Sequence, residues 1–145
     1  RMRTLIACPA LAAFPTAAMA AETTPIDIGA MPSKEVYGVA DLTPLAISAS
    51  GEPAVVLLDL EAGEVVPPHA AKSGLRLLTV ISGATSWGDG GEVVEGRETV
   101  YPPGSLLTVP AKLDHWLAAR SGPARIRVIV LDDEIVVPGV RSQMK

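Results

Sequence analysis

The chain has 145 residues, with 12 basic and 16 acidic side chains and a formal net charge of −4. An acidic chain of this kind is a poor binder of nucleic acids and anionic membranes, so we expect neither as a partner. The length fits one domain, and a single cysteine cannot form an internal disulfide, so a hydrophobic core must hold the fold.

Residues 1–20 have the pattern of a secretory signal peptide. Two arginines open the segment, an apolar run follows, and Ala18–Met19–Ala20 is a small-x-small cleavage site. The run is too short for a membrane span. We expect cleavage after Ala20, which leaves 145 − 20 = 125 residues in the periplasm or outside the cell, with no membrane segment. The alternatives are a buried or disordered N-terminal arm, or a lipoprotein cleavage box in "LIAC" ahead of Cys8.

Residues 21–44 are polar and contain prolines, and they predict an extended lead-in with an edge strand at Ile26–Ile28. From there, short apolar runs alternate with turns rich in Gly and Pro. In chain order the runs cover residues 45–48, 54–60, 75–82, 84–87, 92–94, 99–101, 105–110, 115–119 and 124–132. Short runs rich in Val, Ile, Leu and Thr predict an all-β sandwich or barrel over residues 45–137, with little helix.

The last of these runs shows the period of two that is typical of a strand with one buried face. Its alternation predicts that Arg125 and Arg127 face outward while Ile126, Val128 and Val130 face inward. Beyond it, Ile135–Val137 could form another edge strand, and we expect residues 138–145 to be a fraying tail.

Two segments contain the only two histidines. The first is "GEVVPPHAAKSGLRLLTVISG" (63–83) and the second is "GSLLTVPAKLDHWLAA" (104–119). Together they resemble the two motifs of the cupin superfamily, which has a glycine, five residues and H-x-H in the first motif and a histidine after G-x5-P in the second. His69 and His115 stand at the first and fourth metal-ligand places of that family. The resemblance covers roughly residues 54–132 and implies a small jelly-roll barrel of two antiparallel sheets.

The remaining motif places depart from the family pattern. Ala71 stands at the second histidine place, Arg76 at the glutamate place, Lys112 at the second-motif glycine and Ala119 at the asparagine. A catalytic divalent metal generally needs about three protein ligands. Two imidazoles beside a permanently charged guanidinium are a poor set of metal ligands, so we expect no tightly bound metal. His69 and His115 would be metal ligands only in the alternative case, a metal-dependent enzyme.

What remains is a pocket with His69 and His115 as candidate acid–base catalysts. By a period of two Arg76 shares a face with Leu78 and Val80, and if it points inward it could grip a carboxylate; the alternative is a solvent-exposed arginine on the barrel exterior. Trp116 and Tyr101 are further candidate ligand-binding residues, although packing is the commoner role of such rings. Alternation from His69 predicts that Val65, Pro67 and Ala71 face inward with it, unless a bulge shifts the register.

Three functions are compatible with these residues. The first is an exported cupin that binds a small organic anion in its barrel, with acid–base chemistry by histidine. The second is a metal-dependent oxygenase-, isomerase- or lyase-like enzyme that recruits a further ligand to His69 and His115. The third is a degenerate cupin whose barrel is plugged by side chains and which acts as an interaction module. The resemblance also implies a homodimer.

Overall fold

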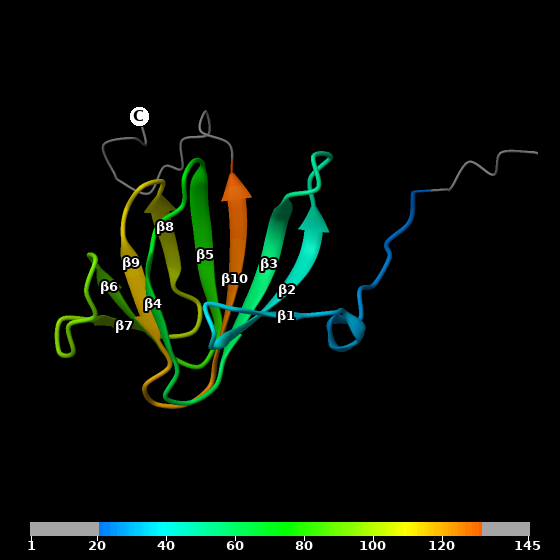
Figure 1. Cartoon of the computed structure of the whole chain (residues 1–145). Helices are drawn as coiled ribbons and strands as arrows, with labels where there is room; N and C mark the ends of the chain where they lie inside the picture. Colours follow the sequence, from blue (N-terminus) through cyan, green and yellow to red (C-terminus); the bar gives the residue numbers. More distant parts are fainter. Residues whose placement is uncertain (1–20, 132–145) are drawn as a thin grey trace, which may run out of the picture.

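Two antiparallel sheets face each other in residues 21–131, the part of the chain that the computed structural model describes (Figure 1). One sheet has the order β1-β2-β3-β10-β5-β8 and the other β4-β9-β6-β7. The strands are β1 (Lys34–Val36), β2 (Ala40–Ile47), β3 (Pro53–Leu60), β4 (Val65–His69), β5 (Leu75–Ser82), β6 (Thr85–Asp89), β7 (Thr99–Tyr101), β8 (Leu106–Pro110), β9 (His115–Ala118) and β10 (Ala124–Leu131). The all-β jelly-roll prediction is confirmed.

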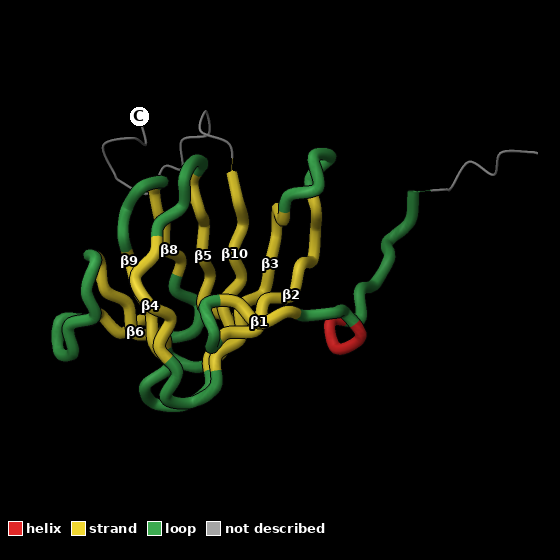
Figure 2. The backbone as a smooth tube through the Cα atoms, in the orientation of Figure 1, coloured by secondary structure: helices red, strands yellow, loops and turns green. Residues whose placement is uncertain are grey.

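The predicted signal peptide, the edge strand at Ile135–Val137 and the C-terminal tail lie outside the described residues. Within them, a single-turn 3-10 helix, η1 (Ile28–Ala30), is red in Figure 2. It replaces the predicted edge strand at Ile26–Ile28, because the Asp27 carboxylate accepts a hydrogen bond from the Gly29 N–H and starts a turn. No described helix is long and apolar enough to cross a bilayer.

The six-stranded sheet begins earlier in the chain than the sequence predicts. β1 pairs with the first three residues of β2, so residues 34–44 belong to the sheet and not to an extended lead-in. Pro44 hides this strand in the sequence, because proline lacks a ladder donor. It is tolerated because β1 pairs only as far as Leu42, which leaves that side of Pro44 without a neighbouring strand. The run at 92–94, by contrast, is an exposed loop.

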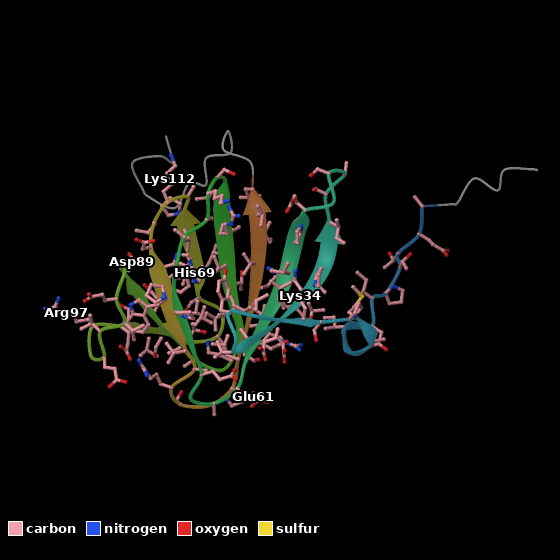
Figure 3. All side chains as sticks on the ribbon, viewed as in Figure 1. Lys34, Glu61, His69, Asp89, Arg97 and Lys112 are labelled. Atoms are coloured by element: carbon pink, nitrogen blue, oxygen red, sulfur yellow. The ribbon has the colours of Figure 1, made fainter. Side chains whose placement is uncertain are left out.

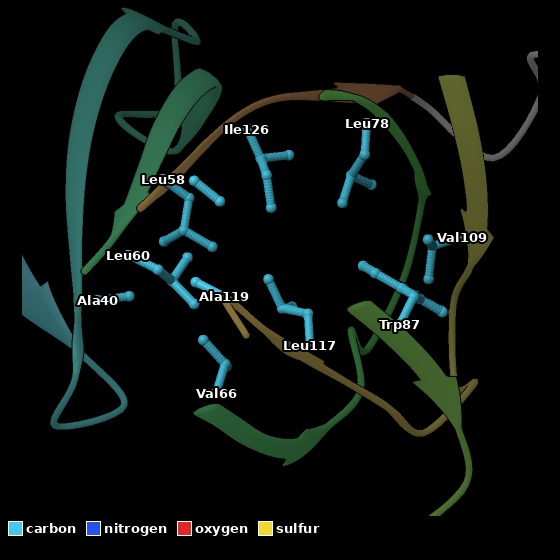
Figure 4. Packing of buried hydrophobic residues seen from close by; sticks show 11 residues of the cluster. Ala40, Leu58, Leu60, Val66, Leu78, Trp87, Val109, Leu117, Ala119 and Ile126 are labelled. Atoms are coloured by element: carbon cyan, nitrogen blue, oxygen red, sulfur yellow. The ribbon is translucent and has the colours of Figure 1, made fainter. Parts of the chain in front are cut away.

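The hydrophobic core fills the space between the sheets toward one end. Both sheets contribute to it, as Figure 4 shows, with side chains from β3, β10 and β5 facing those from β4, β9 and β6. Its buried members are Ala40, Leu58, Leu60, Val66, Leu78, Trp87, Val109, Leu117, Ala119, Ala124 and Ile126. The predicted alternation in β10 is confirmed: Ile126 is buried, and Arg125 lies on the outer face, where it makes an ion pair with Asp59 of β3 at 2.6 Å.

Candidate functional site

A cavity of about 710 Å³ lies between the sheets above the core. Residues of the β2–β3 and β4–β5 loops line part of it, and these two loops lie at the same end of the molecule (Figure 1). Toward the core its wall is apolar and includes Leu42, Leu58 and Leu117. Its polar side chains are those of Tyr37, Glu52, His69, Lys72, Ser73, Arg76 and His115. This size and composition are those of a site for a small organic molecule. A barrel with such a cavity is not completely filled by side chains.

The two histidines meet inside this cavity, although they are 46 positions apart in the sequence (115 − 69). His69 ends β4 and His115 begins β9, and the two residues face each other in the β4–β9 ladder. Their ring centroids are 4.3 Å apart at an interplanar angle of 61°. Figure 3 labels His69 beside β4. The structure therefore places both imidazoles at one point.

A β-bulge in β4 brings His69 inward. From Val66 to His69 the strand advances three residues, while its partner β9 advances two, from Leu117 to His115. The extra residue falls at Pro67–Pro68, which cannot donate ladder hydrogen bonds. Val66 is fully buried in the core, so the simple alternation that placed Val65 and Pro67 inward with His69 is wrong for this strand.

Backbone carbonyls set the tautomer of both rings. The Nδ1 of His69 lies 2.8 Å from the Pro67 carbonyl oxygen, and the Nδ1 of His115 lies 2.9 Å from that of Leu113. A carbonyl oxygen only accepts hydrogen bonds, so each Nδ1 carries the proton. In the neutral rings, each Nε2 therefore keeps a lone pair that can accept a proton or bind a metal.

Two further rings extend the histidine pair into a row. Tyr37, in the β1–β2 turn, packs on His69 with centroids 4.4 Å apart. Trp87, in β6, stacks on His115 with centroids 4.7 Å apart and an interplanar angle of 7°. The order Tyr37–His69–His115–Trp87 crosses the four-stranded sheet from the edge at β4 to β6. This aromatic row encloses the histidines on both sides.

Burial lowers the pKa of His115 below its ordinary value of 6.5, and the neighbouring His69 acts in the same direction. The hydrogen bond to the Leu113 carbonyl and the carboxylates of Asp89 and Asp114 oppose the shift without cancelling it. His115 is therefore neutral near pH 7 and can act as a base.

Arg76 lines the same cavity as the histidines, from the sheet opposite them. It lies in β5 between Val109 of β8 and Val130 of β10. Its Nη1 donates a hydrogen bond to the Ser73 carbonyl, which holds the guanidinium beside the β4–β5 loop. The predicted alternation in β5 places it on the face of Leu78 and Val80, both of which are buried.

Trp116 and Tyr101 lie elsewhere. Trp116 is 1% exposed and packs across Gly88 of the neighbouring strand, with the Arg120 guanidinium carbon 5.9 Å from its ring centroid. It alternates with His115 and Leu117, which both line the cavity, so it points to the other face of β9. Tyr101 lines a second hollow of about 410 Å³ with Trp87. Neither ring lines the cavity that contains the histidines.

The donor set does not fit the catalytic metal that cupin motifs imply. Within residues 21–131 no group of three His, Cys, Asp or Glu side chains is placed to hold an ion. Ala71 and Arg76 stand at two of the family's ligand places, and both line the cavity without offering a metal ligand.

Sequence reasoning missed four residues of this region. Tyr37, Glu52 and Lys72 line the cavity, and Trp87 stacks on His115. Lys72 lies inside the first motif and could have been considered. Tyr37 lies 32 positions before His69 (69 − 37), and no local pattern indicates that the two rings meet.

No protein-family model matches the chain, and no curated protein matches it. Several solved structures do match the chain. KdgF from a Halomonas species aligns at 18% identity over 68% of this chain and 85% of its own, with a TM-score of 0.54. A predicted oxalate decarboxylase from Thermotoga maritima aligns at 12% identity over 74% and 99%, with a TM-score of 0.59. A cupin superfamily protein from Desulfitobacterium hafniense aligns at 20% identity over 68% and 84%, with a TM-score of 0.51.

At these identities the likeness concerns the fold and not the activity. It agrees with the two motifs and with the facing antiparallel sheets. The described part of the chain has the cupin fold.

Proposed function

We propose that this protein binds a small organic anion in its barrel and that a histidine of the pair exchanges a proton with the bound molecule. The observation that supports this most is that Arg76 and both imidazoles line one cavity. A guanidinium at the place of a ligand carboxylate favours an anionic guest over a metal ion.

The cavity also indicates how such a molecule would lie. The permanent cation of Arg76 lies beside the β4–β5 loop, Lys72 lines the cavity from that loop, and Glu52 is the single carboxylate among the lining residues. The wall toward the core is apolar. A carboxylate with a hydrocarbon or aromatic body matches both the cationic and the apolar part of the cavity. Its charge would lie at Arg76 and its body against Leu58 and Leu117.

The proton chemistry follows from the tautomers. A neutral His115 has its Nε2 lone pair available and can take a proton from a carbon or hydroxyl beside the bound carboxylate. The protonated His115 can then return that proton from Nε2 to another atom of the bound molecule, with the His69 ring in contact beside it. We propose this as the catalytic role of the pair, in a protein that is exported by its N-terminal segment.

Calorimetric titration with acetate, octanoate, benzoate and octylamine tests the binding. We expect the two larger carboxylates to bind best and the amine not to bind. Arg76→Met should weaken carboxylate binding about 10- to 100-fold, the range for a lost charge-assisted hydrogen bond. Arg127→Met is the matched control, because Arg127 is an exposed arginine on the outer face of the adjacent strand. Equal losses in both variants, or preferred binding of the amine, would rule out this site.

One observation favours the metal-dependent alternative. A histidine that donates its Nδ1 proton to a carbonyl is the usual arrangement of a metal ligand, and both histidines have it. Metal analysis of the purified protein separates the two functions. Stoichiometric zinc, iron, manganese or nickel that disappears in His69→Ala and His115→Ala would replace the proposal above with the metal-dependent one.

A further inference from the structure

Tyr37 has a backbone conformation that tyrosine rarely adopts. It is the first central residue of the turn that joins β1 and β2, with φ 56°, and Gly38 follows with φ 73°. The Val39 N–H donates to the Val36 carbonyl and closes the turn. A left-handed conformation costs a residue other than glycine roughly 1–2 kcal/mol. Strain of this kind is concentrated at functional sites, so the position of this side chain needs a reason.

The side chain reaches from one sheet to the other. β1 and β2 form one edge of the six-stranded sheet, whereas His69 lies in β4 at the edge of the four-stranded sheet. The Tyr37 ring packs on the His69 ring with an interplanar angle of 32° and lines the cavity. Tyr37 is still 49% exposed, and it does not pack against the core. Core packing therefore does not explain the strained conformation of Tyr37.

His69 is held between two rings. His115 contacts one side of its imidazole and Tyr37 contacts another, while its Nδ1 donates to the Pro67 carbonyl. A free imidazole side chain prefers to carry its proton on Nε2, and a partly exposed ring can rotate away from a carbonyl. A tyrosine ring packed on the imidazole restricts such a rotation.

We infer that Tyr37 is a positioning residue of this site. It holds the His69 ring in its Nδ1–H tautomer, and it forms the wall of the anion-binding cavity where the β1–β2 turn meets β4. The second half of this inference rests on the proposed function, and the first half does not. Burial raises the pKa of the Tyr37 hydroxyl, and the charge of Arg76 acts in the opposite direction. The hydroxyl is therefore protonated near pH 7 and is a donor for a bound anion.

Two substitutions separate the ring from its hydroxyl. Tyr37→Phe keeps the ring, and Tyr37→Asn removes it while tolerating the left-handed conformation. Lys112→Asn is the control, because Lys112 is the other described non-glycine residue with a positive φ, at 66°, and its side chain is exposed. Denaturant unfolding should show that Tyr37→Asn is as stable as the parent or more stable, which excludes a general loss of structure.

Nitrogen-15 spectra of the histidine rings give the direct test, since the chain has only two histidines and both are in the site. We expect Nδ1–H signals for both rings in the parent, in Tyr37→Phe and in Lys112→Asn. In Tyr37→Asn, His69 should shift toward the Nε2–H tautomer while His115 does not change. Unchanged tautomers in Tyr37→Asn would overturn the positioning role.

Benzoate titration tests the cavity wall. We expect the affinity for benzoate to fall about tenfold in Tyr37→Asn, and by less in Tyr37→Phe, which loses only one hydrogen bond. If the parent binds benzoate and Tyr37→Asn binds it equally well, the wall assignment is wrong. If no variant binds benzoate or octanoate, the proposed function fails, and the tautomer spectra still decide the positioning role.

Discussion

Lys112 occupies a backbone position that suits glycine. It stands at the glycine place of the second motif and has a φ of 66°. Its N–H donates to the Ala71 carbonyl at 2.8 Å, so it ties the loop before β9 to the loop after β4. These two loops adjoin His115 and His69. The motif glycine therefore reflects a turn that joins the two histidine loops, and this chain makes the same turn with a strained lysine.

Relief of that strain should stabilise the protein. Lys112→Gly removes the cost of a left-handed backbone, roughly 1–2 kcal/mol, but ordering a glycine on folding costs roughly 0.5–1 kcal/mol more in chain entropy. We therefore expect the free energy of unfolding to rise by about 0.5–1 kcal/mol. Urea unfolding measures it. Lys112→Ala keeps the strain and removes the charged side chain, so an equal gain in that variant would attribute the effect to the side chain.

His115 should make stability depend on pH. Its folded pKa is lowered, chiefly by burial, below the ordinary 6.5 that applies to the unfolded chain. Between those two values the unfolded state binds more protons than the folded state, so stability is lost as the pH falls through this window and is restored above it. Urea midpoints at about pH 7.5 and about pH 5.5 should differ less in His115→Gln than in the parent. An unchanged pH dependence in that variant would exclude this contribution.

The sequence alone predicts part of this site. His69 and His115 follow from motif spacing, and strand alternation places Arg76 on the face of Leu78 and Val80 without deciding that this face is the inner one. Tyr37 does not, because its contact depends on how the β1–β2 hairpin lies against β4, which is a property of the packed sheets. Tyr101 and Trp116 appeared equivalent to site residues in the sequence, but their strand positions direct them away from the histidine cavity.

Single elements of the fold depend on close backbone approaches. At the β5–β6 turn, Gly83 has a φ of 69°, and a β-carbon added there would lie 2.0 Å from the Pro123 carbonyl oxygen. That carbonyl belongs to the segment that leads into β10, the strand between β3 and β5. The last glycine of the first motif therefore lets two connections cross at the closed end of the barrel.

Gly83→Ala should destabilise the fold by about 3 kcal/mol or more, because backbone atoms cannot move aside cheaply. Gly96→Ala is the matched control: Gly96 has a similar φ of 83° with no atom within 4 Å of an added β-carbon, so it should cost only the conformational penalty, roughly 1–2 kcal/mol. The difference in unfolding free energy isolates the clash. Equal losses would show that the β5–β6 turn adapts.

Most strands were predicted, but β1 and β4 lie in none of the predicted runs, and the inward-facing residues were predicted correctly for β10 and not for β4. β5, β7 and β10 match the predicted runs closely because Gly or Pro borders each of these Val-, Ile-, Leu- and Thr-rich patterns on at least one side. β4 contains the Pro67–Pro68 bulge, and the bulge changes which residues face inward without leaving a local pattern in the sequence. β2 was recognised only from residue 45, because its pairing with β1 is visible only in the assembled sheet.

The molecule as a whole divides into a packed end and a hollow end. Leu60, Ala119 and Ile126 fill one end of the barrel, and the cavity occupies the other. Stability is therefore concentrated in the packed end and in the central strands, which leaves the β2–β3 and β4–β5 loops less constrained. A protein of this design can hold a guest without disrupting its core.

Hydrogen exchange should show this division. β3, β10 and β5 are paired on both sides and should exchange slowest, whereas the three-residue edge strand β7 should exchange fastest among the strands. Mass spectrometry of peptides after deuterium labelling measures the rates. Protection of β7 equal to that of β10 would contradict a stability gradient across the sheets.

The contact between Trp87 and His115 has an optical consequence. An imidazolium accepts an electron from an excited indole that touches it and quenches its emission, whereas a neutral imidazole does so weakly. Trp87 is stacked on His115, and the chain's other indole, Trp116, lies on the opposite face of its strand. The intrinsic fluorescence of the unlabelled protein therefore reports whether the histidine site is charged, against a steady background from the second indole.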